Sequence, residues 1–269
     1  MKRSLLLILF TLSACESNQQ QVSIAFNVEF NGQPIRCDSE SPVALTDLRF
    51  FIHDLELTGA DGTVVPTRLK RDSAWQNGAV AFIDLENGQG GCDDGTPESN
   101  ARVIASVSSD SDLAGLQGLR FTLGVPFELN HSNLLEAAPP LDDAAMHWHW
   151  RSGYKFLRAG VETDNDSFWF HLGSTACQGT TGNISGCDSP NRPIVELAGF
   201  NPQTDSVVID IGRLFDAVDL EDGERSDCSS GPTEQSCPPV LATLGLGPEA
   251  STIADGVFAA RPRQATVSQ

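Results

Sequence analysis

Apolar side chains occupy every second position from Val22 to Phe30, and Asn31-Gly32 follows directly. A period of two is typical of a strand with one face in a core and one face in solvent, and Asn-Gly favours a tight hairpin turn. Similar short runs, separated by Gly, Pro, Asn and Asp, occur at 48–57, 79–85, 102–107, 119–125, 167–172 and 206–211. The sequence therefore predicts a chain built mostly of short strands joined by turns.

Helical periodicity is nearly absent, and only 133–138 and 214–220 favour short helices. Many strands with few helices indicate a mainly β protein, an antiparallel β-sandwich or a barrel-like β fold. No change of composition marks an internal boundary. We therefore expect a single β domain over residues 22–259, followed by a loose C-terminal tail at 260–269.

The first 15 residues are typical of an export signal, with Lys2 and Arg3 before an apolar stretch too short to cross a membrane. Leu12-Ser13-Ala14-Cys15 matches a bacterial lipobox, which predicts a signal peptide at 1–14 and a lipid on Cys15. An ordinary signal peptide with another cleavage site is the alternative. Glu16 is not the usual inner-membrane retention residue, so we expect an outer-membrane lipoprotein, periplasmic or at the cell surface. Residues 15–21 would be a polar tether, and the membrane would be reached through the lipid only.

Six cysteines remain when Cys15 is set aside, and an even number in an exported protein indicates disulfide bonds. Thiolate ligation of zinc is the alternative, but no pair has the close CxxC spacing of a zinc site. Other connectivities stay open, but the spacings suggest two local loops and one longer clamp: Cys177–Cys187, Cys228–Cys237 and Cys37–Cys92. We therefore expect long loops pinned by disulfides.

The chain carries a formal net charge of −19. Removing a signal peptide that contains Lys2 and Arg3 would change this charge to −21. A surface this acidic argues against nucleic acid as a partner, because phosphate binding needs basic groups. It suits a soluble exported protein and could attract a cationic partner or a metal ion.

The segment at 146–156, MHWHWRSGYKF, concentrates unusual side chains. It holds two of the four tryptophans, two of the five histidines and the only tyrosine. Indole is oxidisable and imidazole binds metals, whereas alternating aromatic residues along a strand usually serve packing. If the segment is extended, its two histidines share one face and its two tryptophans share the other.

Three further histidines, His53, His131 and His171, lie in or beside aromatic strands. Imidazole suits copper, zinc and nickel, although a histidine on an apolar strand face is often a hydrogen-bonded core residue. Hydrolase, P-loop and dinucleotide motifs are absent from the sequence. We therefore expect a binding protein and no enzyme.

Two acidic loops, Asp164-Asn165-Asp166 and Asp222-Gly223, could hold Ca²⁺ through oxygen atoms. Neither loop matches the EF-hand spacing, and solvated loops are the simpler interpretation.

Several motifs occur in a fixed order: LTDLRFFIHDLEL at 45–57, GVPFELNH at 124–131, PPL at 139–141, MxWxW at 146–150, GYKF at 153–156 and HLGSTxC at 171–177. In this order they resemble the MbnP-like family of exported copper-binding proteins, also described as the four-Cys member of a metallo-mystery pair. The resemblance covers roughly residues 22–212.

In that family a di-haem cytochrome c peroxidase-like partner oxidises a tryptophan to kynurenine. Histidine imidazoles and the kynurenine amine then bind copper, as Cu(I) or Cu(II). The resemblance implies the following ligands and oxidised residue: His53, His131 and His171, with His149 in reserve, and Trp148 or Trp150. The four family cysteines would correspond to Cys37, Cys92, Cys177 and Cys187, with Cys228 and Cys237 as an additional staple.

Two alternatives remain open from the sequence. The disulfides, the acidity and the alternating strands also suit a structural or adhesive cell-surface β-domain without metal. A redox or hydrolytic enzyme that uses the histidines with zinc or copper has no supporting base or nucleophile motif.

Overall fold

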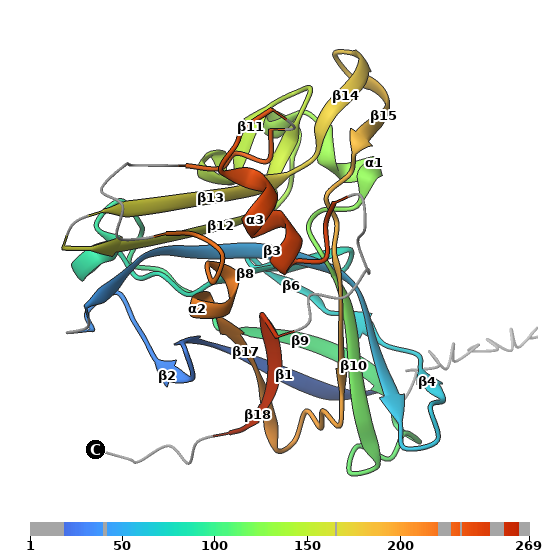
Figure 1. The fold of residues 1–269 in the computed structure, drawn as a ribbon. Helices are drawn as coiled ribbons and strands as arrows, with labels where there is room; N and C mark the ends of the chain where they lie inside the picture. The colour runs from blue at the N-terminus through green and yellow to red at the C-terminus, as the bar shows by residue number, and fades with distance from the viewer. Residues whose placement is uncertain are drawn as a thin grey trace, which may run out of the picture.

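The computed structural model describes residues 19–39, 42–164, 166–219, 227–231, 233–247 and 256–263, and Figure 1 shows their fold. The expected signal peptide and Cys15 lie outside these residues. Two sheets and a separate hairpin make up the molecule. The structure confirms the mainly β, sandwich-like fold; its sheets do not form a closed barrel.

The smaller sheet has the order β18-β17-β1-β9-β5, with β2 paired to β1. Its strands are β1 (Gln19–Phe30), β2 (Gln33–Pro34), β5 (Arg68–Leu69), β9 (Arg102–Ser108), β17 (Asp205–Asp210) and β18 (Phe258–Pro262). Only β1 and β17 run parallel; the other pairs are antiparallel. The predicted hairpin is confirmed, because Asn31 and Gly32 both adopt positive φ angles between β1 and β2.

The larger sheet has the order β11-β12-β3-β8-β7-β6, with β4 and β10 also paired to β3, β13 to β12 and β16 to β10. Its strands are β3 (Val43–Gly59), β4 (Val64–Val65), β6 (Arg71–Ser73), β7 (Gln76–Asn77), β8 (Val80–Asp84), β10 (Leu116–Leu123), β11 (His147–His149), β12 (Gly153–Thr163), β13 (Ser167–Gly173) and β16 (Ile194–Ala198).

Strand β3 organises the larger sheet. Along one edge it pairs with β12 through its first half and with β10 through its second half, while β8 and β4 pair with its other edge. Asp54 has a positive φ of 50°, and the register with β10 shifts beside it. This irregularity bends the pairing directly after His53.

The separate hairpin consists of β14 (Thr175–Thr180) and β15 (Asn183–Ser189), which lie at the upper right in Figure 1. Helical turns are short: α1 (Phe127–Asn130), α2 (Ile211–Leu214), α3 (Cys237–Thr243) and the 3-10 turns Gly90–Cys92, Leu134–Glu136 and Ala144–Met146. Within the described ranges, no helix has the length and apolar character needed to cross a bilayer.

The main core lies between the two sheets. Phe26 of β1 packs edge-on against Phe50 of β3 and Phe121 of β10, with ring centroids 5.7 and 6.1 Å apart. Phe258 of β18 contacts both of those partners at 6.2 and 5.7 Å. Edge-to-face aromatic pairs of this kind add specific geometry to the burial of apolar area.

Three disulfides pin the loops, and they join the cysteine pairs that the spacings suggested: Cys37–Cys92, Cys177–Cys187 and Cys228–Cys237. The first and third pairs are buried, with no member more than 4% exposed. The second pair joins β14 to β15 and is only half-buried.

Several predicted boundaries were wrong. The residues 19–21, expected in the tether, begin β1, and residues 260–262 of the expected loose tail pair with β17 in β18. The helix expected at 214–220 lies earlier, since α2 ends at Leu214. All seven predicted strands are present, and the helix expected at 133–138 is the 3-10 turn Leu134–Glu136.

Candidate metal centre

The predicted aromatic segment begins with β11, which folds back on the start of β12. His147 lies opposite Tyr154, and His149 lies opposite Gly153, with a register shift between the two pairs. Trp150 is outside the strand and in the connecting turn. The segment is therefore extended only over three residues, and the predicted alternation of two histidines and two tryptophans does not continue through Trp150.

Asn130, the last residue of α1, holds this turn. Its Oδ1 accepts a hydrogen bond from the Tyr154 backbone at 2.9 Å, and its Nδ2 donates to the Ser152 carbonyl at 3.1 Å. Gly153 has a positive φ of 77°, and a β-carbon at this position would overlap Asn130. Glycine is therefore required where the turn meets α1.

Trp148 and His171 are in contact. Their ring centroids are 6.5 Å apart in an edge-on arrangement, and the outer edge of the indole lies over Gly173. A β-carbon at Gly173 would overlap the Trp148 ring. The absence of a side chain on this residue of β13 therefore allows Trp148 to reach His171.

The buried Nε2 of His171 has no hydrogen-bond partner among the described residues. Burial lowers the pKa of His171 to about 4, and the positive charges of Arg158 and Lys155 act in the same direction. The imidazole is therefore neutral near pH 7, which is the form that can bind a metal ion.

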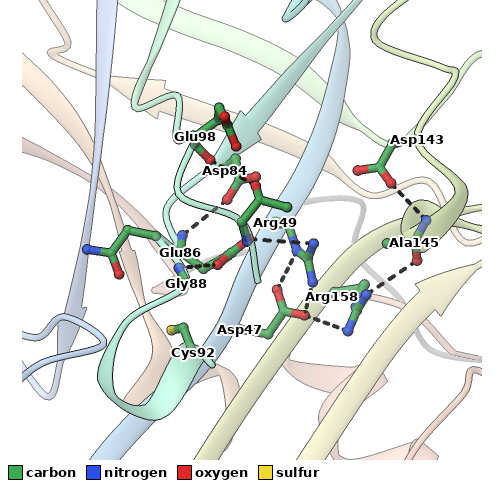
Figure 2. A network of polar contacts seen from close by, with 12 residues as sticks. Asp47, Arg49, Asp84, Glu86, Gly88, Cys92, Glu98, Asp143, Ala145 and Arg158 are labelled. Carbon is green, nitrogen blue, oxygen red and sulfur yellow. Dashed lines mark hydrogen bonds and ion pairs between the residues drawn. The ribbon is translucent and has the colours of Figure 1, made fainter. Parts of the chain in front are cut away.

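The loop before Trp148 is tied to strand β12 through one carbonyl group. Lys155 Nζ donates to the Ala145 carbonyl at 2.8 Å, and Arg158 Nη1 donates to the same oxygen at 3.3 Å. The Ala145 backbone N–H donates to Asp143 Oδ1 at 2.7 Å. Figure 2 shows Ala145 between Asp143 and Arg158.

Arg158 also belongs to a buried ion network that continues across β3. Its Nη2 lies 2.8 Å from Asp47 Oδ2, and Asp47 receives a bidentate contact from Arg49 at 2.8 and 2.7 Å. Arg49 approaches Glu86 at 3.6 Å, and Glu86 accepts hydrogen bonds from backbone groups of the loop that follows. The network thus links the Trp148 loop to the loop that carries Cys92 (Figure 2).

Asp84 lies at the end of this network with 3% of its surface exposed. Burial and the neighbouring charge of Glu86 raise the pKa of Asp84 to about 8. The carboxyl is therefore mainly protonated at pH 7, so the network contains fewer negative charges than its composition indicates.

His131 lies directly after α1, on the side of the β14–β15 hairpin. Its Nε2 is 3.2 Å from Asn130 Nδ2 and 3.7 Å from Cys187 Sγ, and its ring is 5.3 Å from that of Phe127. Burial lowers the pKa of His131, and Nδ1 is buried with no hydrogen-bond partner in the described structure.

His53 is 5% exposed and is enclosed by the strands on either side of β3. Its Nδ1 lies 2.9 Å from Asp54 Oδ2, whereas its Nε2 is buried without a hydrogen-bond partner in the described part of the chain. Burial lowers the pKa of His53 more than Asp54 raises it.

The two histidines of β11 differ. His147 packs against Tyr154, with ring centroids 5.0 Å apart, and its Nε2 is buried and unpartnered among the residues described. His149 is exposed; its Nδ1 accepts from the Arg151 backbone at 3.2 Å, and its Nε2 lies 3.4 Å from Ser152 Oγ.

The predicted ligands do not form one cluster. Within the described ranges, only two sets of three potential ligand atoms lie within 4.8 Å of one another: His131 with Cys177 and Cys187, and Glu234 with Cys228 and Cys237. In both sets the sulfurs form a disulfide. The candidate centre therefore consists of histidines at separate points, and in the described structure His171 is the one whose ring contacts a tryptophan ring of the segment.

The donor set nevertheless suits copper. Four of the five histidines bury a ring nitrogen without a hydrogen-bond partner in the described structure: His53, His131, His147 and His171. Unpartnered buried polar atoms are uncommon in proteins and call for an explanation such as an ion. Neutral imidazole is a nitrogen donor that copper accepts.

The possible calcium sites in the acidic loops gain no support from the described residues. Asp166 uses Oδ1 to accept from the Ser167 backbone at 2.7 Å, and the loop contributes to neither set of clustered ligand atoms. Asp222-Gly223 lies outside the described residues.

A family model described as MbnP matches residues 19–230. The chain belongs to the MbnP family. MbnP from Methylosinus trichosporium is a solved structure with a TM-score of 0.77 and 25% sequence identity to this chain, covering 92% of this chain and 100% of its own. No curated protein matches the sequence. The MbnP match begins with β1 and includes every candidate histidine and tryptophan, whereas α3 and β18 lie beyond it.

Sequence reasoning missed the side chains that hold the site. Asp47, Lys155 and Arg158 had no recognised role in fixing the Trp148 loop, because they meet only through the pairing of β12 with β3. Asn130 lay inside a recognised motif, but nothing in the motif indicated that its side chain closes the turn after Trp150.

Proposed function

We propose that this MbnP-family protein is an exported copper-binding protein that acts in copper binding and homeostasis. The observation that carries the proposal is the contact between Trp148 and His171. The two rings are 6.5 Å apart, and the histidine has a buried Nε2 without a partner among the described residues. An oxidised Trp148 would thus lie beside a nitrogen that is free to bind a metal ion.

Trp148, rather than Trp150, is the residue that we assign to oxidation to kynurenine. Trp150 lies in the turn, where the Arg151 guanidinium covers its ring at 5.0 Å, and it has no histidine among its ring contacts in the described structure. Trp148 is half-buried, so the indole remains partly accessible from outside. A kynurenine amine in this position would add a nitrogen donor next to His171.

His171 is the first histidine that we assign to copper. His149, His53 and His131 remain further candidates, and His147 adds an unpartnered buried nitrogen on the same short strand as Trp148. Bound copper would supply a centre that can accept nitrogen donors as Cu(I) or Cu(II). The chain itself supplies neutral imidazoles and a fixed loop.

We further propose that a di-haem cytochrome c peroxidase-like protein oxidises Trp148, and that the protein itself is not an enzyme. The partly exposed indole of Trp148 supports oxidation by a partner, because an electron can leave the indole without a substrate pocket in this chain. We also propose that a lipid on Cys15 anchors the protein at the outer membrane, on the periplasmic or outer side. The lipobox sequence supports the anchor.

The test compares Trp148→Phe with Trp150→Phe, each produced together with the di-haem partner. We expect wild type and Trp150→Phe to bind copper, and Trp148→Phe to lose about tenfold or more in affinity. Equal affinities for the two variants, or loss only in Trp150→Phe, would contradict the assignment.

His171→Gln separates the copper protein from a structural or adhesive β-domain. If the protein binds copper through His171, the variant should lose copper with little change in its unfolding temperature. If the protein is a metal-free β-domain, the variant should change in stability and have the same metal content as the wild type.

A further inference from the structure

The hairpin β14–β15 carries a disulfide that differs from the other two. Cys177 and Cys187 lie opposite each other in the two strands, and both are half-buried. Cys37, Cys92, Cys228 and Cys237 are at most 4% exposed. Disulfide exchange requires a thiolate to reach one of the sulfurs, so a reductant can attack Cys177–Cys187 most readily.

An imidazole from another part of the fold reaches this disulfide. His131 Nε2 lies 3.7 Å from Cys187 Sγ, and the nitrogen and both sulfurs lie within 4.8 Å of one another. His131 is placed by α1 and not by the hairpin, so the three atoms come from two separately held elements (Figure 1). Asn130 Nδ2 also touches His131 Nε2, but it keeps the Ser152 carbonyl as a second partner. The imidazole can therefore turn to a metal ion without leaving that amide unsatisfied.

We propose that reduction of the Cys177–Cys187 disulfide creates a Cu(I) site formed by these two sulfurs and His131 Nε2. This site is separate from the Trp148–His171 contact and uses His131, which is then no longer a candidate ligand of the copper centre at that contact. It rests on the proposed function only in taking copper as the metal. Two soft thiolates and one imidazole favour Cu(I), which accepts three ligands, over cations that prefer oxygen.

The chemistry balances with a dithiol as the reductant. The dithiol gives two electrons and two protons, its own sulfurs join as a disulfide, and the Cys177–Cys187 bond breaks to give two thiols. Binding of Cu(I) then releases the two thiol protons to water, because the ligands are thiolates. Reduction breaks the disulfide within the hairpin. The backbone pairing of β14 with β15 remains available to hold the two cysteines opposite each other.

The second sulfur cluster does not offer the same chemistry. Cys228 and Cys237 are fully buried, and Glu234 is already occupied as the acceptor of the Ser229 backbone at 2.6 Å. The proposed Cu(I) site is therefore the one in the hairpin.

The experiment uses the full mature chain before and after mild dithiol reduction without oxygen. Thiol counting should find two new thiols, and mass mapping should place both in the hairpin. Cu(I) is titrated against a chromogenic chelator, and X-ray absorption reports the ligand atoms. We expect one additional Cu(I) per chain after reduction, with sulfur among its neighbours.

Three variants identify the ligands. The double variant Cys177→Ser/Cys187→Ser should lose the additional ion, and His131→Gln should weaken its binding about tenfold or more. His171→Gln should keep it, so failure of the Trp148 site and failure of this site are distinguishable. Circular dichroism of each variant checks that the β fold is retained.

Several results would overturn the proposal. These are reduction at another disulfide, no additional Cu(I) after reduction, a shell without sulfur, or an unchanged ion in either the double variant or His131→Gln. Binding of Zn²⁺ in preference to Cu(I) under the same conditions would also overturn it.

Discussion

Arg158 Nη2 lies 2.8 Å from Asp47 Oδ2, while Nη1 of the same guanidinium donates to the Ala145 carbonyl. One side chain thus connects a buried ion network in β3 to the loop that presents Trp148. The position of the indole depends on charges that lie inside the larger sheet, and not only on the turn that carries it.

The first prediction concerns Arg158→Gln. The change leaves Asp47 without one of its two arginines at a site that is 2% exposed, and removing one partner of a buried ion pair typically costs about 3–5 kcal/mol. Arg158 is itself 14% exposed, so we expect the lower part of that range in the free energy of unfolding, measured with denaturant.

Arg120→Gln is the matched control for this change. Arg120 pairs with Glu56 and Glu196 on the surface, where each side chain is at least one-third exposed. Exposed pairs contribute about 1 kcal/mol or less, so the loss should be small. Equal losses for Arg158→Gln and Arg120→Gln would contradict the structural role of the network.

The second prediction concerns Gly173→Ala. The new methyl group would overlap the Trp148 ring and the Tyr154 carbonyl, so the indole must move away from His171. We expect reduced kynurenine formation and copper affinity about tenfold lower or more, with the fold retained in circular dichroism.

Gly186→Ala is the control, because a β-carbon there would meet only the end of the Gln178 side chain, at 4.0 Å. This variant should match the wild type in kynurenine absorbance and copper binding. Normal modification of Trp148 in Gly173→Ala would contradict the role of the glycine.

The third prediction is a pH dependence that originates in Asp84. Its pKa is raised from an ordinary 3.8 to about 8, so the folded protein binds a proton that the unfolded chain has released. The contribution of this group to stability is therefore complete below pH 4 and is lost as the pH rises towards 8, by at most about 1.4 kcal/mol per pH unit.

Asp84→Asn removes this titration. The free energy of unfolding of the wild type should fall relative to that of the variant between pH 4 and pH 8, as followed by denaturant titration at several pH values. The quantity to follow is the free energy of unfolding of the wild type minus that of the variant. If this quantity stays constant or rises with pH, Asp84 is ionised in the folded protein.

Sequence patterns predicted β1 well because its sheet has one solvent-facing side, so apolar residues alternate along it. They missed β12, which is buried along most of its length and shows no alternation. The edge strand β18 has only five residues, too few for a pattern that distinguishes a strand from a loose tail. Two of the disulfides join cysteines that are close in sequence. Once those four cysteines are paired, Cys37 and Cys92 remain for the third disulfide.

The candidate site was predictable only as a set of residue types. Histidines and tryptophans were visible in the sequence, but the contact of Trp148 with His171 requires β11 to fold back and β13 to pair with β12. Likewise, His131 meets Cys187 because α1 lies beside the hairpin. Contacts between distant strands leave no local pattern, so sequence reasoning could not choose between Trp148 and Trp150.

The most direct test of the central claim is the mass of the peptide that contains Trp148 and Trp150, from protein purified out of its native envelope. Fragmentation locates any change to one of the two residues. The structure predicts a mass gain matching conversion of tryptophan to kynurenine at Trp148, with Trp150 unmodified. Conversion at Trp150, or two unmodified tryptophans, would contradict the assignment of the copper centre to the Trp148–His171 contact.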